Sequence, residues 1–235
     1  MTCGRFNILI FLFALLLTSS CTSQQDTSDD QVIETMSDPV RFLALGDSYT
    51  IGQGVEEDQR WPVQLGEQLK ENDFEVPVVN IIAQTGWTTN NLINAIENTE
   101  LEDYNLVSLL IGVNNQFQSL PFEIFESEFD ALLTIAINIA GSQEKVFVVS
   151  IPDYGVTPFG SGNSQTIAEE LDAYNSYMAL RCDDLEIPFI NITEISRTLG
   201  DSPGALAPDN LHPSGSQYAA WTDEILPIVL QILEE

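Results

Sequence analysis

Residues 40–49 read VRFLALGDSY, a short apolar run that ends in a glycine and is followed at once by polar side chains. A run of residues 40–45 in which apolar side chains do not alternate with polar ones is typical of a strand buried on both faces, as in a parallel sheet. Gly46 permits a tight turn after this strand, and a helical turn can begin within residues 49–54. The stretch therefore predicts a central parallel strand that delivers Ser48 to one edge of a sheet.

Similar apolar runs recur along the chain, and a stretch with helical spacing separates each from the next. They cover residues 76–82, 106–111, 146–151 and 188–192. Helices are expected at residues 61–72, 88–99, 122–136, 167–184 and from 214 to the end, with Pro227 expected to kink or interrupt the last one. This alternation predicts an α/β fold, a three-layer α/β/α sandwich around a five-stranded parallel sheet. Its functional loops should gather at the carboxyl ends of the strands.

The composition limits the classes of partner that the chain is expected to bind. The chain has 235 residues, enough for one sizeable α/β core, and 36 acidic against 7 basic residues give it a net charge of −29. Nucleic acid and anionic membrane surfaces should be repelled by such a domain, while neutral or cationic substrates are weakly favoured. The alternative is that the acids coat the surface for solubility. Charge alone therefore identifies no substrate.

The first twenty residues are expected to be an export signal and not part of the fold. Arg5 precedes an apolar stretch from Ile8 to Leu17, which is too short to span a bilayer. Small residues then lead to Cys21, an arrangement that resembles a bacterial lipoprotein signal in which this cysteine becomes lipidated. Thr18 stands where that signal usually has a leucine, so ordinary signal cleavage nearby is the competing interpretation. Either interpretation places the mature domain outside the cytoplasm, and the first predicts an anchor in a membrane of the cell envelope.

The chain after the signal divides into a tether and one domain. Residues 21–39 are polar and acidic without sustained apolar periodicity, which indicates a solvated tether, and residues 40–235 form the expected catalytic domain. If Cys3 leaves with the signal and Cys21 carries lipid, Cys182 remains alone and no internal disulfide can form. We expect Cys182 to be buried in the core without a chemical role.

His212 is the one histidine of the chain, and a serine nucleophile needs an imidazole to take its proton. Asp209 precedes it by three residues, a spacing at which the carboxylate can accept from one ring nitrogen while the other faces Ser48. Pro213 favours an extended backbone at His212, and Ser214 can cap the last helix. Both motifs have ordinary structural alternatives: serine is a common helix cap, and an Asp-x-x-His match often arises by chance.

Two loop residues have the properties of oxyanion donors. Gly86 follows the second predicted strand, where a missing side chain lets its backbone N–H approach a substrate closely. Asn114 follows the third predicted strand and offers a neutral amide donor. Taken singly, a loop glycine or asparagine is far more often a turn former than a catalytic residue.

The order of these residues resembles that of the SGNH, or GDSL-like, hydrolases, from about Val40 to the end of the chain. The resemblance implies a flavodoxin-like sheet, with Ser48 as nucleophile, His212 as base and Asp209 as its orienter. It also implies an oxyanion hole formed by the Ser48 N–H, the Gly86 N–H and the Asn114 amide. Two residues depart from the family pattern: Tyr49 replaces a leucine, and Asn115 stands where an aspartate commonly follows the asparagine. The second departure leaves undecided whether residue 115 makes the local structural hydrogen bond expected of the aspartate.

The resemblance implies ester or thioester hydrolysis through an acyl-enzyme without a metal or organic cofactor. A small or medium acyl group on a neutral alcohol, such as an acetylated carbohydrate, suits the acidic domain better than an anionic phospholipid. Lysophospholipase or thioesterase activity and a non-catalytic surface-binding lipoprotein are the alternatives, while a single histidine without clustered ligands argues against metal-dependent hydrolysis. Three aromatic residues are candidates for an apolar wall that limits acyl length, although core packing explains them equally well: Trp87, Phe117 and Phe159.

Overall fold

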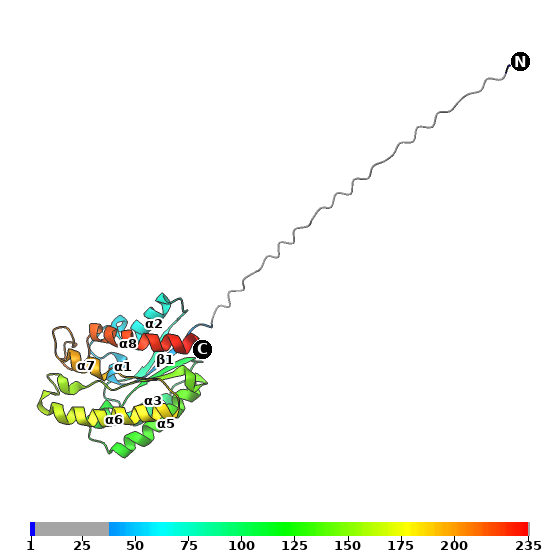
Figure 1. The fold of residues 1–235 in the computed structure, drawn as a ribbon. Coiled ribbons are helices and arrows are strands. Elements are labelled where there is room, and N and C mark those ends of the chain that lie inside the picture. Colours follow the sequence, from blue (N-terminus) through cyan, green and yellow to red (C-terminus); the bar gives the residue numbers. More distant parts are fainter. Residues whose placement is uncertain (3–37, 235) are drawn as a thin grey trace. The chain divides into compact units, whose positions relative to one another are not determined.

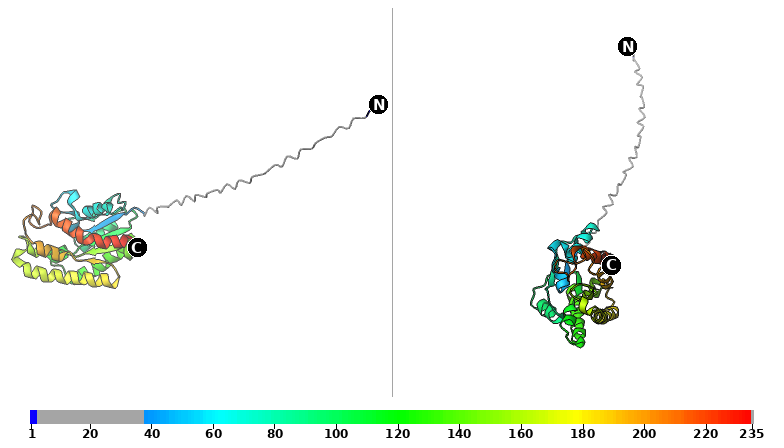
Figure 2. Two further views of the ribbon diagram at one scale, coloured as in Figure 1. Left: turned by 45° about the horizontal axis from the view of Figure 1, so that its top comes forward. Right: turned by 90° about the vertical axis from the view of Figure 1, so that its left-hand side faces the viewer.

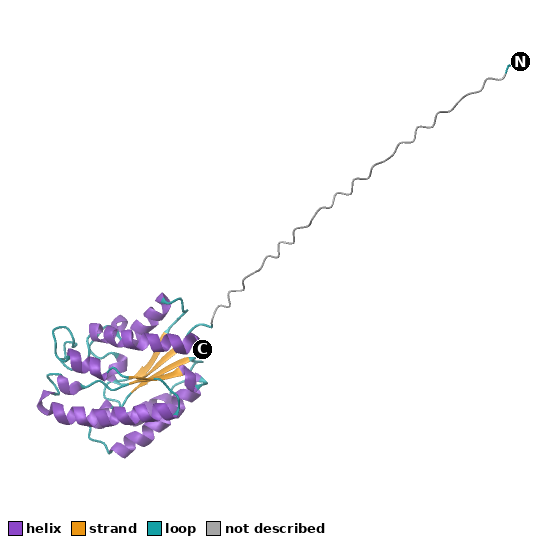
Figure 3. Ribbon diagram, in the orientation of Figure 1, coloured by secondary structure: helices purple, strands orange, loops and turns teal. Residues whose placement is uncertain are grey.

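The computed structural model describes residues 1–2 and 38–234 (Figure 1). The predicted signal (1–20), Cys21 and the tether (21–39) lie outside the described residues, except for two residues at each end of that span. Strands and helices alternate through residues 38–234, as the sequence predicts (Figure 3). Within this described part, no helix combines the length and the apolar character needed to cross a lipid bilayer.

The predicted five-stranded parallel sheet is confirmed. Its strands stand in the order β2-β1-β3-β4-β5, and each neighbouring pair is parallel. β1 lies between β2 and β3, with Phe42 opposite both Val79 and Leu106. The strands cover Phe42–Gly46 (β1), Val79–Ala83 (β2), Leu106–Leu110 (β3), Val146–Val149 (β4) and Phe189–Ile190 (β5).

Strand position explains the burial pattern and two errors in the predicted bounds. Every residue of β1, β3 and β4 is buried, whereas β2, at one edge of the sheet, is half-buried throughout. β2 begins at Val79, three residues later than predicted, because Pro77 has no N–H to donate to the ladder. β5 keeps two of its five predicted residues, because a helix begins directly after it at Thr193.

Two helical layers enclose the sheet. α2 and α8 pack together on one face, while α3, α5 and α6 cover the other face (Figures 1 and 2). The apolar stripe predicted for residues 122–136 is confirmed, since Phe125, Phe129 and Leu132 are fully buried in the core. The helices span Trp61–Glu71 (α2), Thr89–Glu97 (α3), Phe122–Ala140 (α5), Ser164–Asp184 (α6) and Gly215–Glu234 (α8).

Pro227 was expected to kink or interrupt the last helix, and the interruption is wrong, because α8 runs through Pro227 from Gly215 to Glu234. The proline lies on the exposed side of the helix, whereas Trp221, Ile225 and Val229 are fully buried on the opposite side. The carbonyl group that loses its partner at Pro227 therefore faces water, and apolar packing holds the helix together on both sides of the proline.

A helix that the sequence analysis missed, α7, covers Thr193–Leu199. Its sequence signals were present: the Thr193 N–H donates to the Asn191 side chain at 3.0 Å, and Glu194 lies in the first turn. An asparagine before a helix and an acid in its first turn both satisfy or complement free N–H groups. Seven residues are too few for an apolar period to stand out, which explains the omission.

Cys182 lies in α6 with its side chain fully buried, as predicted. Burial raises the pKa of its thiol to about 12. Because the thiolate is the reactive form of cysteine, this side chain is an inert part of the core at neutral pH.

Candidate active site

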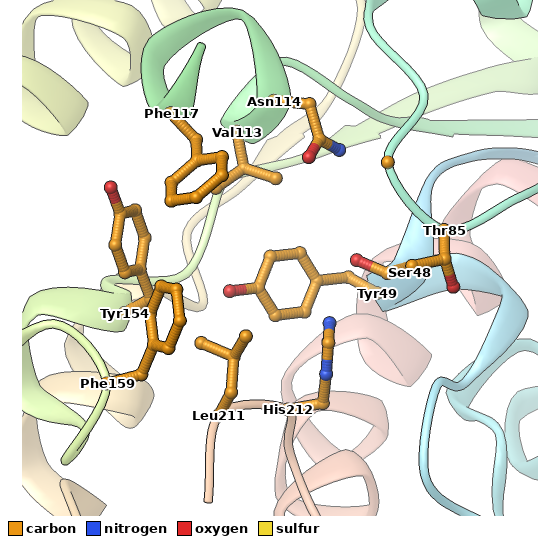
Figure 4. A pocket seen from close by; sticks show the side chains of 11 residues that line it. Ser48, Tyr49, Thr85, Val113, Asn114, Phe117, Tyr154, Phe159, Leu211 and His212 are labelled. Carbon is orange, nitrogen blue, oxygen red and sulfur yellow. The ribbon is translucent and has the colours of Figure 1, made fainter. Parts of the chain in front are cut away.

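The loops that follow β1, β2 and β3 meet the loop before α8 at one cavity of about 230 Å³ (Figure 4). Four of the five predicted site residues line it, and Asp209 lies behind one of them, His212. The residues that line the cavity are Ser48, Tyr49, Thr85, Gly86, Val113, Asn114, Phe117, Tyr154, Phe159, Leu211 and His212.

Ser48 is the first residue of a short helix, α1 (Ser48–Ile51). The cap of this helix is Asp47, whose carboxylate accepts the Tyr49 N–H at 3.0 Å, so the alternative that Ser48 serves as the cap is wrong. A side chain at Gly46 would put a Cβ 2.5 Å from the Leu110 carbonyl oxygen. Glycine at this position therefore lets the turn fold tightly against β3 and present Ser48 at the edge of the sheet.

Asp47 has an unusual environment for a carboxyl group. It is fully buried, and its Oδ2 has no hydrogen-bond partner among residues 38–234. Burial raises the pKa of Asp47 from 3.8 to about 7, although the N–H of Tyr49 opposes that rise. The carboxyl directly before Ser48 thus changes its charge near neutral pH.

Asp209 and His212 lie on a tight loop before α8. Leu206 and Pro213 form an antiparallel bridge across its base, and the Ala207 N–H donates to the His212 carbonyl at 2.8 Å. Asn210 takes the left-handed conformation at the turn, with φ of 57°. The predicted cap is confirmed, since Ser214 Oγ accepts the Gln217 N–H at 3.3 Å. The loop is therefore held at both ends and presents His212 at the helix entrance.

The Asp209 carboxylate is bound entirely within this loop. Oδ2 lies 2.7 Å from His212 Nδ1, and Oδ1 accepts the backbone N–H groups of Leu211 and His212, each at 3.0 Å. Burial acts to raise the pKa of Asp209, but these hydrogen bonds outweigh it and hold the pKa below the ordinary value. Asp209 therefore stays ionised at neutral pH and holds the proton of the imidazole on Nδ1.

The other ring nitrogen of His212 points toward the side of the pocket on which the Ser48 hydroxyl lies (Figure 4). Tyr49 packs against the imidazole edge-on, with ring centroids 5.6 Å apart. Within residues 38–234, the imidazole is hydrogen-bonded to Asp209 and not to Ser48. Catalytic hydrogen bonds are often long in the absence of substrate and tighten when it binds, so this arrangement is compatible with proton transfer.

Gly86 lines the cavity with a backbone φ of 85°. A Cβ at this position would meet no atom within 4 Å, so a lack of room is not the reason for glycine. The positive φ is the reason, because a residue with a side chain adopts this conformation only with strain. The turn closes with the Trp87 N–H donating to the Gln84 carbonyl at 3.2 Å.

Asn114 lies in a second short helix, α4 (Val113–Phe117), and its amide projects into the cavity region (Figure 4). Its Nδ2 donates to the Trp87 carbonyl oxygen at 2.9 Å. One amide N–H thus joins the loop after β3 to the loop after β2. Two candidate oxyanion donors, Gly86 and Asn114, are connected through Trp87.

Asn115 is fully buried and makes the structural hydrogen bonds that the sequence left open. Its Oδ1 accepts the Thr89 N–H at 3.0 Å, and its Nδ2 donates to Thr89 Oγ1 at 2.6 Å. The Thr89 hydroxyl in turn donates to the Glu128 carboxylate. Because Thr89 gives its one hydroxyl proton to Glu128, it requires a donor on its other side, which asparagine supplies and an ionised aspartate cannot.

The predicted apolar wall is only partly correct. Phe117 and Phe159 line the cavity with large exposed surfaces, 53% and 56%, whereas Trp87 packs against the hydrophobic core. Phe117, Phe159 and Tyr154 form a cluster of rings with centroids 5.9 to 6.3 Å apart. Four further residues belong to the wall, and no local sequence pattern distinguishes them from core residues: Tyr49, Val113, Tyr154 and Leu211.

Residues 44–220 match the model of the GDSL-like Lipase/Acylhydrolase family. An arylesterase of Vibrio mimicus is 24% identical over 116 residues, which cover 49% of this chain and 58% of that protein, so the chain spans less than two thirds of that relative's length.

Solved structures with low sequence identity have the same fold. TesA superposes with a TM-score of 0.63 at 15% identity, covering 82% of this chain and 99% of that one. An acetyl xylan esterase from Geobacillus stearothermophilus gives 0.63 at 18% identity, covering 83% and 96% of the two chains. The esterase EstA from Pseudoalteromonas sp. gives 0.59 at 17% identity, covering 83% and 99%.

Proposed function

We propose that this chain, which belongs to the GDSL-like Lipase/Acylhydrolase family, is a serine ester hydrolase and that Ser48, His212 and Asp209 are its catalytic triad. The observation that carries this proposal is the pairing of His212 Nδ1 with Asp209 Oδ2 at 2.7 Å, beside a cavity that Ser48 also lines. That pairing leaves the second imidazole nitrogen free to accept a proton, which is what a serine nucleophile requires.

In the proposed reaction, Ser48 Oγ attacks the carbonyl carbon of the ester while its proton passes to His212. The Ser48 N–H, the Gly86 N–H and the Asn114 amide stabilise the oxyanion. His212 then protonates the leaving alcohol, and the acyl group remains on Ser48. Water, deprotonated by the same imidazole, attacks the acyl carbonyl and releases the carboxylic acid and the free enzyme.

The substrate we propose has a short or medium apolar acyl group and a neutral alcohol. A cavity of about 230 Å³ holds roughly seven or eight water-sized groups at about 30 Å³ each. Its wall consists largely of Phe117, Tyr154, Phe159, Val113 and Leu211, which suits a chain of several methylene groups better than an acetyl group alone. The net charge of −29 supports a neutral alcohol over an anionic phospholipid.

An acetylated carbohydrate is the second candidate substrate. It is supported by the similarity of fold to the acetyl xylan esterase and by the open, exposed rim at Phe117 and Phe159, on which a sugar ring can pack. The small volume of an acetyl group relative to the cavity is the argument against it.

The test is a series of p-nitrophenyl esters from acetyl to hexadecanoyl, run beside acetylated xylan, lysophospholipid and an acyl thioester. We expect the highest kcat/KM at four to eight acyl carbons, and no turnover in Ser48→Ala. Ester hydrolysis by Ser48→Ala at the rate of the wild type would refute the triad, whereas no hydrolysis by either protein would favour a surface-binding protein. A maximum at acetyl would favour the carbohydrate esterase instead, and a maximum on lysophospholipid or thioester would favour those alternatives.

We further propose that the enzyme works outside the cytoplasm as a lipoprotein anchored through Cys21. The support is the sequence alone: the apolar stretch before Cys21 and the acidic tether after it. Mass spectrometry of protein from the native membrane fraction tests it. We expect a mature chain that begins at Cys21 with attached acyl groups, and loss of membrane association in Cys21→Ser. Cleavage at another residue without lipid would contradict the proposal.

A further inference from the structure

Tyr49 stands where the family commonly has a leucine, directly after the proposed nucleophile. Its side chain is 3% exposed, and its ring packs near those of His212 and Trp221, with centroids 5.6 and 6.2 Å away. In Figure 4 the ring extends from the α1 backbone across the pocket, and its hydroxyl points away from Ser48 toward the apolar wall. A leucine in this position would fill space, whereas tyrosine adds one polar atom at the apolar end of the cavity.

The Tyr49 hydroxyl has no partner in the described part of the chain. The backbone N–H of Tyr49 donates to Asp47, but the phenol makes no hydrogen bond with any of residues 38–234. The side chain lines the cavity, and its oxygen is not shielded from it, unlike the buried and unpartnered hydroxyl of Tyr218. A molecule bound in the cavity can therefore accept a hydrogen bond from the Tyr49 hydroxyl.

Apart from the proposed triad, the other polar side chains around the cavity already have hydrogen-bond partners within the protein. Thr85 Oγ1 donates to Gln53 at 2.6 Å, and Tyr154 donates its hydroxyl to Gln116 at 2.9 Å. Asn114 donates one N–H to the Trp87 carbonyl. Tyr49 is thus the polar side chain that remains available at the apolar end.

We propose that the Tyr49 hydroxyl is a specificity-determining donor that recognises an oxygen atom carried by the acyl part of the substrate, several bonds from the ester carbonyl. The substrate class is an ester whose acyl chain is apolar except for one ether, keto or hydroxyl oxygen. This inference rests on the proposed ester hydrolysis at Ser48. In this proposal the acyl group extends along the pocket toward Tyr49. The oxyanion donors lie beside the carbonyl oxygen, and His212 lies beside the leaving alcohol.

The phenol is suited to a donor role. Burial first, and then the negative charges of Asp47, Asp153 and Asp209, raise the pKa of Tyr49 well above 10. The hydroxyl therefore keeps its proton throughout the physiological range. Charge repulsion from the same carboxylates disfavours a carboxylate at this end of the acyl group, so the recognised oxygen is a neutral one.

The experiment compares p-nitrophenyl heptanoate with three isosteric esters in which an ether oxygen replaces the methylene at acyl position 4, 5 or 6. An ether oxygen only accepts hydrogen bonds, so it reports a donor without changing chain length. The measured quantity is the ratio of kcat/KM for each ether ester to that for heptanoate. We expect this ratio to peak at one position and to be at least about tenfold higher in the wild type than in Tyr49→Phe.

Tyr177→Phe is the matched control, because it removes a phenol hydroxyl that donates to the Glu126 carbonyl oxygen, in a residue that does not line the cavity. We expect it to keep the wild-type ratios. Equal ratios in the wild type and Tyr49→Phe at all three positions, with unchanged melting temperatures, would overturn the inference. The inference would also be overturned if the Tyr49-dependent preference for an ether oxygen appeared only when that oxygen was in the alcohol part of the ester.

Binding separates this inference from the proposed function. Calorimetry with Ser48→Ala measures the affinity for the methyl esters of the same acyl chains, with and without the additional Tyr49→Phe change. Preferential binding of one ether ester that depends on Tyr49 supports the inference even if the wild type hydrolyses no ester, which would refute only the triad. Turnover without any Tyr49-dependent preference in rate or affinity refutes only the inference, and a protein that neither binds nor hydrolyses these esters refutes both.

Discussion

Both oxygens of the Asp209 carboxylate are bound to His212: Oδ2 lies 2.7 Å from the ring Nδ1, and Oδ1 accepts the backbone N–H at 3.0 Å. The carboxylate therefore orients the imidazole and also closes the turn that carries it. Because the partners are only three positions apart in the sequence, the pair is built by local backbone geometry. Its position opposite Ser48 depends on the sheet, since β1 and the loop before α8 are far apart in sequence.

His212→Ala should reduce kcat/KM by on the order of a thousandfold or more, because the serine then loses the base that takes its proton. Asp209→Asn should also reduce the rate strongly, since an amide that donates to Nδ1 leaves the proton on the wrong nitrogen. Steady-state kinetics on the best p-nitrophenyl ester measure both. Asp201→Asn, an exposed acid in the preceding loop, is the control. Wild-type turnover in His212→Ala would end the triad proposal.

Turnover should fall on acidification, because the base that accepts the Ser48 proton must be unprotonated. Steady-state kinetics between about pH 5 and pH 8 test this. The lowered pKa of Asp209 keeps that carboxylate ionised over this range, so it does not cause the loss. Asp47, with a pKa of about 7, titrates in the same range beside Ser48. A pH profile of kcat/KM in Asp47→Asn separates the two groups: the acidic loss should persist there. A flat profile in the wild type would contradict the assignment of His212 as base.

Asp47→Asn should stabilise the protein increasingly as the pH rises from 4 to 8. Burial raises the pKa of Asp47 above its unfolded value, so its favourable contribution is complete below about pH 3.8 and is lost as the pH passes through about 7. Three pKa units correspond to at most roughly 4 kcal/mol between the two limits. Urea unfolding at several pH values measures the difference from the wild type. A difference that does not change with pH would show that Asp47 is not destabilised by burial.

Asn115→Asp should destabilise the protein, by roughly 2 to 4 kcal/mol at pH 8, because a buried carboxylate would replace the amide that donates to Thr89. The same hydroxyl already donates to Glu128, so two acceptors would compete for one proton. Adding Glu128→Gln should recover part of the loss, since glutamine can supply the missing donor. Thermal or urea unfolding of the single and double variants measures this coupling. If Asn115→Asp were as stable as the wild type, the hydrogen-bond polarity inferred at Thr89 would be wrong.

Much of the fold followed from apolar periodicity and from the turn residues. Buried runs such as residues 42–45 and 106–110 identify parallel strands because their hydrophobic pattern differs from that of half-exposed segments. The errors arose where a neighbour overrides the local pattern. β5 is short because α7 begins after it, and Pro227 remains within α8 because the packing of the opposite face holds the helix together.

The candidate site, like the fold, could be predicted from the sequence only in part. The order of Ser48, Gly86, Asn114, Asp209 and His212 along the chain was sufficient to propose them, because the first three follow predicted strands and the last two precede the predicted last helix. The roles of the residues around them could not be predicted from the sequence. An aromatic residue in a loop can face the core or a cavity, so the sequence did not separate Trp87, which packs inward, from Phe117, which lines the pocket.

The sequence by itself determined the layered α/β architecture and the family, because hydrophobic period, turn chemistry and motif order are properties of neighbouring residues. The tertiary structure alone decided which side chains surround the cavity, that Asn115 binds Thr89, and that the Tyr49 hydroxyl lies unpaired at the apolar end. Those facts depend on the meeting of loops from separate strands. The direction of a side chain at such a junction is set by packing against residues that are distant along the chain.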